Sequence, residues 1–416
     1  MVKRIIMHLD ANSAYLSWAA ADRLQHGDAL DLRTIPSVVG GKQETRHGIV
    51  LTKSIPAKRY GIQTGETLYS ARQKCPGLIV VPPDYGLYMQ CSQAFGDILR
   101  QYSPLVEQYS IDEYFMDYTE VQHLYGDPAE AACRIKDRIR NELGFTVNVG
   151  ISTNKLLAKM GSELKKPDMV HTLFPWEMEE KMWPLPVREL FMVGGSTEKK
   201  LHERGIRTIG DLAHAAPERI QSFLKSHGLL VWNYANGRDT SPVHLNRRPV
   251  IKGIGNSCTT PFDARDRKTA HMVLLSLSET VAARLRAGGY CARLVSVSFK
   301  TNEFYNCSHQ RKFYEATDST NAIYKVACEL FGEIWRGQPL RHFGVSTSEL
   351  CGNDFRQPNL FEDTEKQRRI DQTVDAIRER FGSNAIFRSN FVGSGMSGML
   401  GGTGDMEEYP MMSSYL

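Results

Sequence analysis

The sequence contains no run of 18 or more apolar residues and no pair of cysteines in C-x-x-C spacing. Without such a run no helix can cross a bilayer, so we expect no membrane segment. The stretch up to Asp10 carries two cations but too few apolar residues for a signal peptide. The eight cysteines are scattered, which fits neither a zinc site nor a disulfide framework, and we expect reduced thiols in a cytoplasmic protein.

The length of 416 residues exceeds the roughly 250–300 that a single core reaches, so we expect two to four domains. The apolar and charged fractions are ordinary for a globular protein and exclude wholesale disorder. The net charge is only +4, but the positive excess is concentrated between residues 243 and 350, where Arg247, Arg248 and Lys252 lie together without a nearby acid. Such a segment suits a phosphate backbone, and a solvated basic surface is the alternative.

Residues 1–185 mix short apolar runs with helical patterns, which is typical of α/β structure. Residues 5–9 predict a buried strand that ends at Asp10. Apolar residues recur every four positions from Ala131 to Leu143 and predict an amphipathic helix. A strand over residues 146–152 and a helix over 154–163 follow.

The remainder of the chain divides into four segments. Residues 186–242 predict short helices with turns at Gly194-Gly195, Gly205 and Gly210. Residues 243–256 predict a basic linker. Residues 257–349 predict the order strand, helix, strand, strand, helix, strand, and Val295, Val297 and Phe299 alternate with polar residues as in a half-buried sheet. Residues 350–416 predict one helix, over 366–381, and a Gly-, Ser- and Met-rich tail that we expect to be disordered.

Three carboxylates in the first segment indicate catalysis. A strand that delivers Asp10, and a strand pair that delivers Asp112 and Glu113, would bring the three together from distant parts of the chain. Like-charge repulsion makes such a cluster costly unless cations neutralise it. Magnesium is the hard cation that pairs with phosphates, and two such ions can promote an in-line phosphoryl displacement. Each motif alone is more often a solvated surface feature.

Three ordered motifs resemble those of the Y-family translesion DNA polymerases, the ImpB/MucB/SamB family. They are LDANSAY at residues 9–15, YSIDEYFMD at 109–117, and GISTNKLLAK at 150–159 followed by KKP at 165–167. The resemblance covers most of the first 170 residues and implies that Asp10, Asp112 and Glu113 are catalytic ligands of two Mg²⁺ ions. It also implies that the Ala11 backbone carbonyl contributes to the metal site and that Tyr15 is the steric gate against ribonucleotides.

The fold class implied by this resemblance is a multidomain α+β right-hand polymerase. Its expected parts are a βαββαβ palm with small fingers inserted at about residues 20–80, a helical helix-hairpin-helix thumb and a βαββαβ little finger. The palm and fingers occupy residues 1–185, the thumb 186–242 and the little finger 257–349, with the linker at 243–256 and a C-terminal extension at 350–416.

The family segment that grips the incoming triphosphate aligns with residues 52–61. Positions that often carry Tyr and Arg are here Ile55 and Lys58, and Lys is a point charge rather than a bidentate fork. Arg59 is a substitute of the right charge, and the sequence leaves open which of the two acts. The expected triphosphate contacts are Thr52, Lys58, Arg59 and Lys166, and simple solvation of these cations is the alternative.

The expected DNA contacts lie in the thumb, the linker and the little finger. In the thumb, the first hairpin glycine of the family is replaced by Met192, whereas Gly194 keeps the second, so this phosphate contact is expected to be weakened. In the little finger, an exposed sheet face rich in cations is expected to lie along the duplex. The predicted DNA-binding residues are Gly194, Arg247, Arg248, Lys252, Lys300, Arg311 and Lys312.

The segment QPNLF at residues 357–361 resembles the sliding-clamp-binding peptide of bacterial polymerases. Leu360 and Phe361 would fill an apolar pocket of the clamp while Gln357 hydrogen-bonds its rim. Packing of these residues on the little finger is the alternative.

The function implied is low-fidelity, template-directed DNA synthesis past lesions in SOS-type damage tolerance, without a proofreading exonuclease. Primer-template DNA, deoxynucleoside triphosphates and the sliding clamp are the expected partners of a monomeric, nucleoid-associated bacterial enzyme. A catalytically silent, DNA-bound clamp adaptor is the main alternative, but the presence of all three carboxylates disfavours it. A helix-hairpin-helix nuclease or glycosylase would need its own catalytic cluster near the hairpin, and the sequence shows none.

Overall fold

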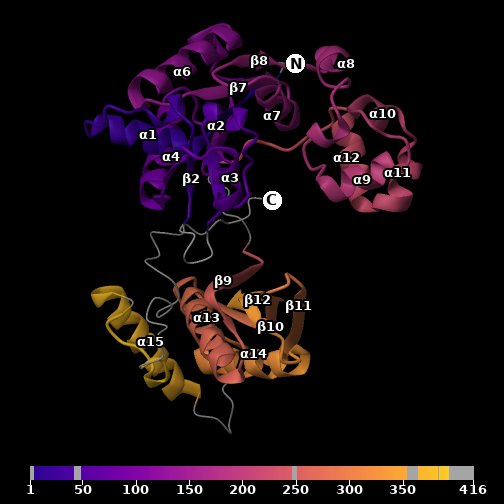
Figure 1. Cartoon of the computed structure of the whole chain (residues 1–416). Coiled ribbons are helices and arrows are strands. Elements are labelled where there is room, and N and C mark those ends of the chain that lie inside the picture. The colour runs from indigo at the N-terminus through magenta and orange to yellow at the C-terminus, as the bar shows by residue number, and fades with distance from the viewer. Residues whose placement is uncertain (1–3, 42–47, 246–250, 354–363, 383, 393–416) are drawn as a thin grey trace.

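The computed structural model describes residues 4–41, 48–245, 251–353, 364–382 and 384–392. Three groups of elements follow one another along the chain: an α/β block, a helical block and a second α/β block (Figure 1). This is the expected α+β multidomain class. No described helix is long and apolar enough to span a bilayer.

The first block is built on a five-stranded sheet with the order β5-β6-β1-β7-β8. Its strands are β5 (Val106–Gln108), β6 (Glu113–Asp117), β1 (Ile6–Ala11), β7 (Val147–Ser152) and β8 (Val170–Thr172). Met7 and Leu9 of β1 join a core with helices α1 (Ala14–Gln25), α4 (Tyr85–Arg100) and α6 (Pro128–Leu143). Ile6 instead packs with Phe115 and with Ala158 of helix α7 (Lys155–Glu163). Since side chains alternate along a strand, Asp10 points to the α7 face.

Local sequence signals explain these helices. The Asp127 side chain accepts hydrogen bonds from the backbone N–H groups of Ala129 and Glu130 at the start of α6, and Gly144 ends the helix with φ +75°. Asn154 likewise caps the start of α7. Gly150 allows α7 to lie close to β7, because a Cβ there would stand 1.9 Å from the Ala158 carbonyl oxygen. The predictions of strand 146–152 and helices 131–143 and 154–163 are confirmed.

A smaller sheet and two helices form the segment predicted as fingers. The order is β3-β2-β4, and the core contains Val38, Val50 and Leu68. The elements are β2 (Ser37–Gly40), β3 (Val50–Lys53), β4 (Ile79–Val81), α2 (Ile55–Arg59) and α3 (Leu68–Lys74).

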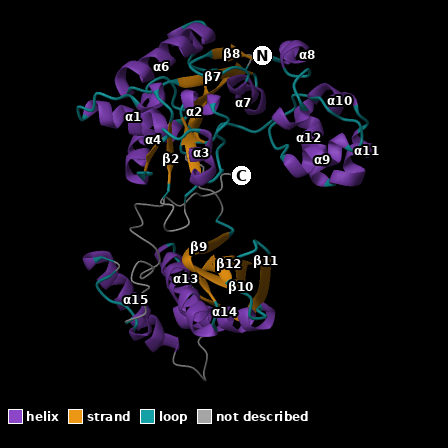
Figure 2. Cartoon of the chain, in the orientation of Figure 1, coloured by secondary structure: helices purple, strands orange, loops and turns teal. Residues whose placement is uncertain are grey.

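The segment predicted as the thumb is a helical cluster, seen to the right of the sheet in Figure 2. Its helices are α9 (Gly195–His202), α10 (Ile209–His214), α11 (Pro217–Leu224) and α12 (Ser226–Ala235). The short helix α8 (Met178–Lys181) precedes the predicted start at residue 186, but Met178 packs into the core of this helical cluster. Gly205, with φ +80°, occupies a turn as predicted. The turn predicted at Gly210 is wrong, because this residue lies inside α10, where a Cβ would stand 3.1 Å from the Trp183 Cβ. Gly210 therefore serves close packing rather than chain reversal.

The second α/β block has the predicted βαββαβ order and a sheet of order β11-β10-β12-β9. Its elements are β9 (Gly253–Ala264), α13 (Arg267–Ala287), β10 (Tyr290–Thr301), β11 (Asn306–Thr317), α14 (Thr320–Ile334) and β12 (Leu340–Gly352). Val295, Val297 and Phe299 are buried against the two helices, as their alternation predicts. The predicted linker 243–256 is too long at its end, because β9 starts at Gly253 and Ile254 pairs with Thr347.

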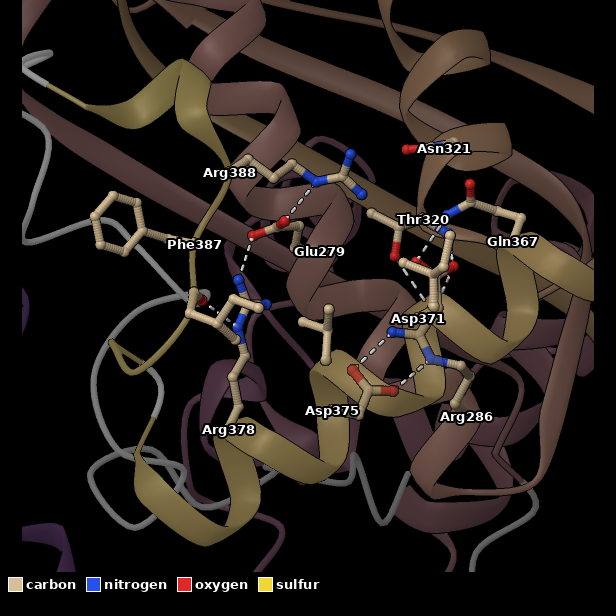
Figure 3. Close-up of a pocket in the computed structure, with 13 residues that line it drawn as sticks. Glu279, Arg286, Thr320, Asn321, Gln367, Asp371, Asp375, Arg378, Phe387 and Arg388 are labelled. Atoms are coloured by element: carbon tan, nitrogen blue, oxygen red, sulfur yellow. Dashed lines mark hydrogen bonds and ion pairs between the residues drawn. The ribbon is translucent and has the colours of Figure 1, made fainter.

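The helix predicted at 366–381 is confirmed as α15 (Thr364–Phe381), which lies against α13 (Figure 1). Figure 3 shows complementary charges that fix its position. Arg286 of α13 bonds Asp375 at 2.5 and 2.9 Å and lies 3.5 Å from Asp371. About two helical turns before Arg286 on α13, Glu279 accepts hydrogen bonds from Arg378 and Arg388 at 3.2 and 2.7 Å. A cavity of about 250 Å³ lies between these groups, but its charges are paired with one another.

We expect Glu279→Ala to weaken the docking of α15 strongly, because Glu279 is only 5% exposed and two guanidinium groups would lose their carboxylate. Breaking a buried pair of this kind costs about 3 kcal/mol of unfolding free energy. Urea denaturation and limited proteolysis of the C-terminal segment measure the effect. Glu329→Ala is the matched control, because its pair with Arg311 is exposed and is worth about 0–1 kcal/mol. Equal losses in the two variants would contradict the expectation.

Candidate active site

The predicted carboxylates meet at the ends of two neighbouring strands. Asp10 on β1 lies directly opposite Glu113 on β6 in the antiparallel register. Asp112 precedes β6 in a turn, and its backbone carbonyl accepts a hydrogen bond from the Ala11 N–H at 2.9 Å. The Ser110 hydroxyl donates to the Asp112 carboxylate at 2.6 Å. The structure therefore brings the carboxylates of Asp10 and Glu113 together. It places Asp112 and the Ala11 backbone, the other two residues that the resemblance assigns to the metal site, beside them.

This cluster is electrostatically strained. Burial raises the pKa of Asp10 to about 8, and Glu113 adds to the rise against the opposing charge of Lys166. Burial also raises the pKa of Asp112. Two lysines among the described residues lie against these carboxylates: Lys166 lies 3.1 Å from Asp10, and Lys159 forms an ion pair with Glu113. The arrangement therefore favours the arrival of positive charge at these carboxylates.

A fourth carboxylate, Glu163 at the end of α7, lies close to two of these three, Asp10 and Glu113. One oxygen each of Asp10, Glu113 and Glu163 lies within 4.8 Å of the others, which makes this a group able to hold a metal ion among the described residues. Such hard oxygen donors are the ligands that divalent ions of the magnesium type prefer, so the residues fit the implied metal. Sequence reasoning missed Glu163, although it lies three residues before Lys166, to which it is bonded at 2.7 Å.

Tyr15, the predicted steric gate, lies beside this cluster. Its ring stacks on Tyr88 of α4 with centroids 4.5 Å apart and an interplanar angle of 9°. It also meets the Tyr85 ring edge to face, with centroids 6.1 Å apart. Burial and then the negative charge of Asp112 raise the pKa of Tyr15 to about 12. Stacking on Tyr88 therefore holds the Tyr15 ring in place, close enough to Asp112 for its charge to affect the pKa of Tyr15.

Of the residues predicted to grip a triphosphate, Lys166 contacts the carboxylates directly. The others belong to the segment predicted as fingers. Thr52 is on β3, and Lys58 and Arg59 are exposed in the last turn of α2. Sequence reasoning missed Lys53, whose pKa is lowered by burial and then by the charge of Lys58. This closeness of two positive charges suits an anion.

In the helical cluster, the turn before α9 keeps a hairpin conformation. Met192 adopts φ +72°, the left-handed region that a glycine would favour, so the replacement of glycine has not removed the turn. Gly194 is the N-cap of α9, and no heavy atom lies within 4 Å of the position a Cβ would take. The backbone at this turn is open to a ligand.

The cations predicted on the open face of the second sheet do not all lie there. Lys312 pairs with Leu294 and Lys300 with Asn306, whereas Arg311 pairs with Val295, which faces the helices. Arg311 accordingly forms ion pairs with Glu329 and Glu333 of α14. Its placement on the open face is wrong, because adjacent residues of a strand point to opposite faces.

The open face carries several small hydroxyl side chains, among them the serines that alternate with Val295, Val297 and Phe299 in the sequence. Ser296 lies between Gln310 and Ser346, and Ser298 lies between Ser308 and Gly344. Lys312 is paired with Glu349 at 2.6 Å. Lys252 is exposed just before β9. Arg247, Arg248 and the peptide with Gln357, Leu360 and Phe361 lie outside the described residues.

The comparisons with known proteins agree with this geometry. The model of the impB/mucB/samB family matches residues 9–163, that of its C-terminal domain residues 251–360, and that of the IMS family HHH motif residues 177–206. "DNA polymerase IV" of Clostridium acetobutylicum is 47% identical over 93% of this chain and 98% of its own. "DNA polymerase IV 2" of Bacillus subtilis is 37% identical over 94% of this chain and 95% of its own.

A solved structure has the same fold: a Y-family DNA polymerase chimera of Dbh and Dpo4 superposes with a TM-score of 0.70 at 22% sequence identity, over 84% of this chain and 100% of that one. The fold and the carboxylate cluster thus define a right-hand polymerase with palm, fingers, thumb and little finger. The chain belongs to the impB/mucB/samB family, the Y-family translesion DNA polymerases.

Proposed function

We propose that the protein is a DNA-directed DNA polymerase of the bacterial cytoplasm that extends primers past damaged template bases, using two Mg²⁺ ions and no proofreading. The observation that carries this proposal is the row of Asp10 and Glu113 on paired strands, with Asp112 in the adjoining turn. These carboxylates and the Ala11 carbonyl would hold the ions. When bound, the ions activate the attacking hydroxyl and stabilise the departing pyrophosphate.

The chain's own residues perform the remaining tasks. Lys166, together with Lys58 or Arg59 of the fingers, neutralises the triphosphate. Lys166 presents its cation beside the carboxylates, and Lys58 and Arg59 present theirs in the last turn of α2. Tyr15 blocks the space that a ribose 2′-hydroxyl would need. The turn at Gly194 offers backbone N–H groups to a DNA phosphate, and Lys300 and Lys312 lie on the open face toward the duplex.

The test is primer extension with Mg²⁺ and each deoxynucleotide on an intact template and on one with an abasic site. We expect incorporation on both, and excision of a mismatched primer terminus on neither. A protein that binds primer-template DNA but incorporates nothing would instead be the catalytically silent clamp adaptor. The carboxylate cluster disfavours that alternative. Burying Asp10 with a raised pKa lowers the stability of the fold, and a protein that only binds DNA would gain nothing from it.

We further propose that residues 357–361 bind the sliding clamp. Changing Gln357, Leu360 and Phe361 to Ala is expected to leave unassisted synthesis unaltered and to abolish stimulation by a loaded clamp. The reason is effective concentration, because a tethered polymerase rebinds its terminus instead of diffusing away. Leu and Phe in a partner pocket each supply about 1.5–3 kcal/mol. The product length with and without clamp, and the melting temperature, are measured on the same triple variant.

If the three side chains pack on the little finger instead, the triple variant melts at a lower temperature and synthesises less DNA without any clamp. A destabilised protein with intact clamp stimulation would contradict the proposal.

A further inference from the structure

Asn148 occupies a special place in the palm sheet. It lies on β7 directly opposite Asp10, and Glu113 lies opposite Asp10 on the other side. Residues paired across neighbouring strands point to the same face, so Glu113, Asp10 and Asn148 form one row across β6, β1 and β7. Asn148 has no exposed surface. A fully buried amide beside the catalytic carboxylates needs partners of its own.

Those partners are the backbone at the end of α7. The Asn148 amide donates to the carbonyl oxygens of Ser162 at 2.9 Å and Lys165 at 2.7 Å. Its own oxygen accepts from the Met169 N–H at 3.2 Å. The Ser162 carbonyl belongs to the last helical turn, whose carbonyls lack intrahelical partners. Asn148 therefore caps α7 and closes the 165–169 turn onto the sheet.

The same turn has an outer anchor. Asp168 bonds Lys136 and Arg140 of α6, both at 2.9 Å. Between the two anchors stands Lys166, whose ammonium lies 3.1 Å from Asp10 and 2.7 Å from Glu163. The inner anchor, Asn148, is therefore paired across the sheet with Asp10, the carboxylate that Lys166 contacts.

We propose that Asn148 is a positioning residue for nucleotide binding. By holding the 165–169 turn, it keeps the Lys166 ammonium at Asp10, where the triphosphate enters. This rests on the proposed function, in which Lys166 contacts the triphosphate. A lysine whose backbone is already fixed loses less conformational entropy when it binds an anion. The anchor therefore affects the affinity for the nucleotide more than the chemical step.

The main test is Asn148→Leu, which keeps the volume of the side chain and removes the amide. We expect the KM for the incoming nucleotide to rise about tenfold, because two carbonyls and one N–H lose their partner, with kcat changed less than about twofold. Asn148→Ser retains one hydroxyl donor and is expected to recover part of the loss. Hydrogen exchange at residues 165–169 is expected to quicken in Asn148→Leu, a readout that needs no activity.

A double-mutant cycle with Lys166→Ala decides whether Asn148 acts through this lysine. In the Lys166→Ala background, Asn148→Leu is expected to change KM by less than about twofold. A full tenfold rise there, or unchanged exchange at 165–169, would overturn the inference. A parental KM in Lys166→Ala alone would overturn it together with the role proposed for Lys166. Failure of the proposed function itself is distinct, since it would show as a parent protein that incorporates no nucleotide.

Discussion

The Asp10→Ala protein is expected to bind primer-template DNA nearly as well as the parent and to lose nucleotide incorporation by more than about a thousandfold. In the proposed function, binding rests on phosphate contacts in the thumb and little finger, whereas metal ions would supply several kcal/mol to the transition state alone. The double change of Asp112 and Glu113 to Ala is expected to give the same result. Single-nucleotide incorporation and DNA-binding titrations measure the two effects separately.

Asp97→Ala is the matched control, because Asp97 is an exposed carboxylate on α4 paired with Arg100.

The pH dependence of the melting temperature checks that the Asp10 variants fold. Since the pKa of Asp10 in the folded protein is raised to about 8, its ionisation costs stability as the pH rises from about 4 through 8. Asp10→Asn removes that cost, so without metal at pH 8 or above it should melt no lower than the parent. Parental extension by Asp10→Ala would refute the assignment of the active site.

Tyr15→Ala is expected to raise ribonucleotide incorporation about a hundredfold or more relative to deoxyribonucleotides. Exclusion by a rigid ring discriminates more strongly than one missing contact, and stacking on Tyr88 prevents the ring from yielding. The measurement is the ratio of kcat/KM for the matched ribo- and deoxyribonucleotide.

Two variants sharpen this test. Tyr15→Phe should keep the selectivity, because the ring rather than the hydroxyl fills the space. Tyr69→Ala removes an exposed tyrosine of the fingers and should leave the ratio unchanged. Parental selectivity in Tyr15→Ala would place the gate at another residue.

The periodicity of apolar residues correctly predicted the buried face of single helices and strands. The helix with Ala131, Ile135 and Ile139 buried, and the little-finger strand with Val295 and Val297 buried, follow from local pattern alone. Because successive side chains of a strand point to opposite faces, the neighbouring residues Arg311 and Lys312 lie on opposite faces of the sheet. The prediction that both cations lie on the open face was wrong because charge alone does not determine to which face a strand residue points.

What the sequence by itself determined is the set of contiguous motifs, because their residue types and spacing are local properties of the chain. Those motifs identify Asp10, Asp112, Glu113 and Tyr15 and the family to which they belong. Only the tertiary structure decided that Glu163 joins the carboxylates and that Asn148 lies opposite Asp10. The register between strands is set by hydrogen bonds and packing between segments far apart in the chain, and no local pattern records it.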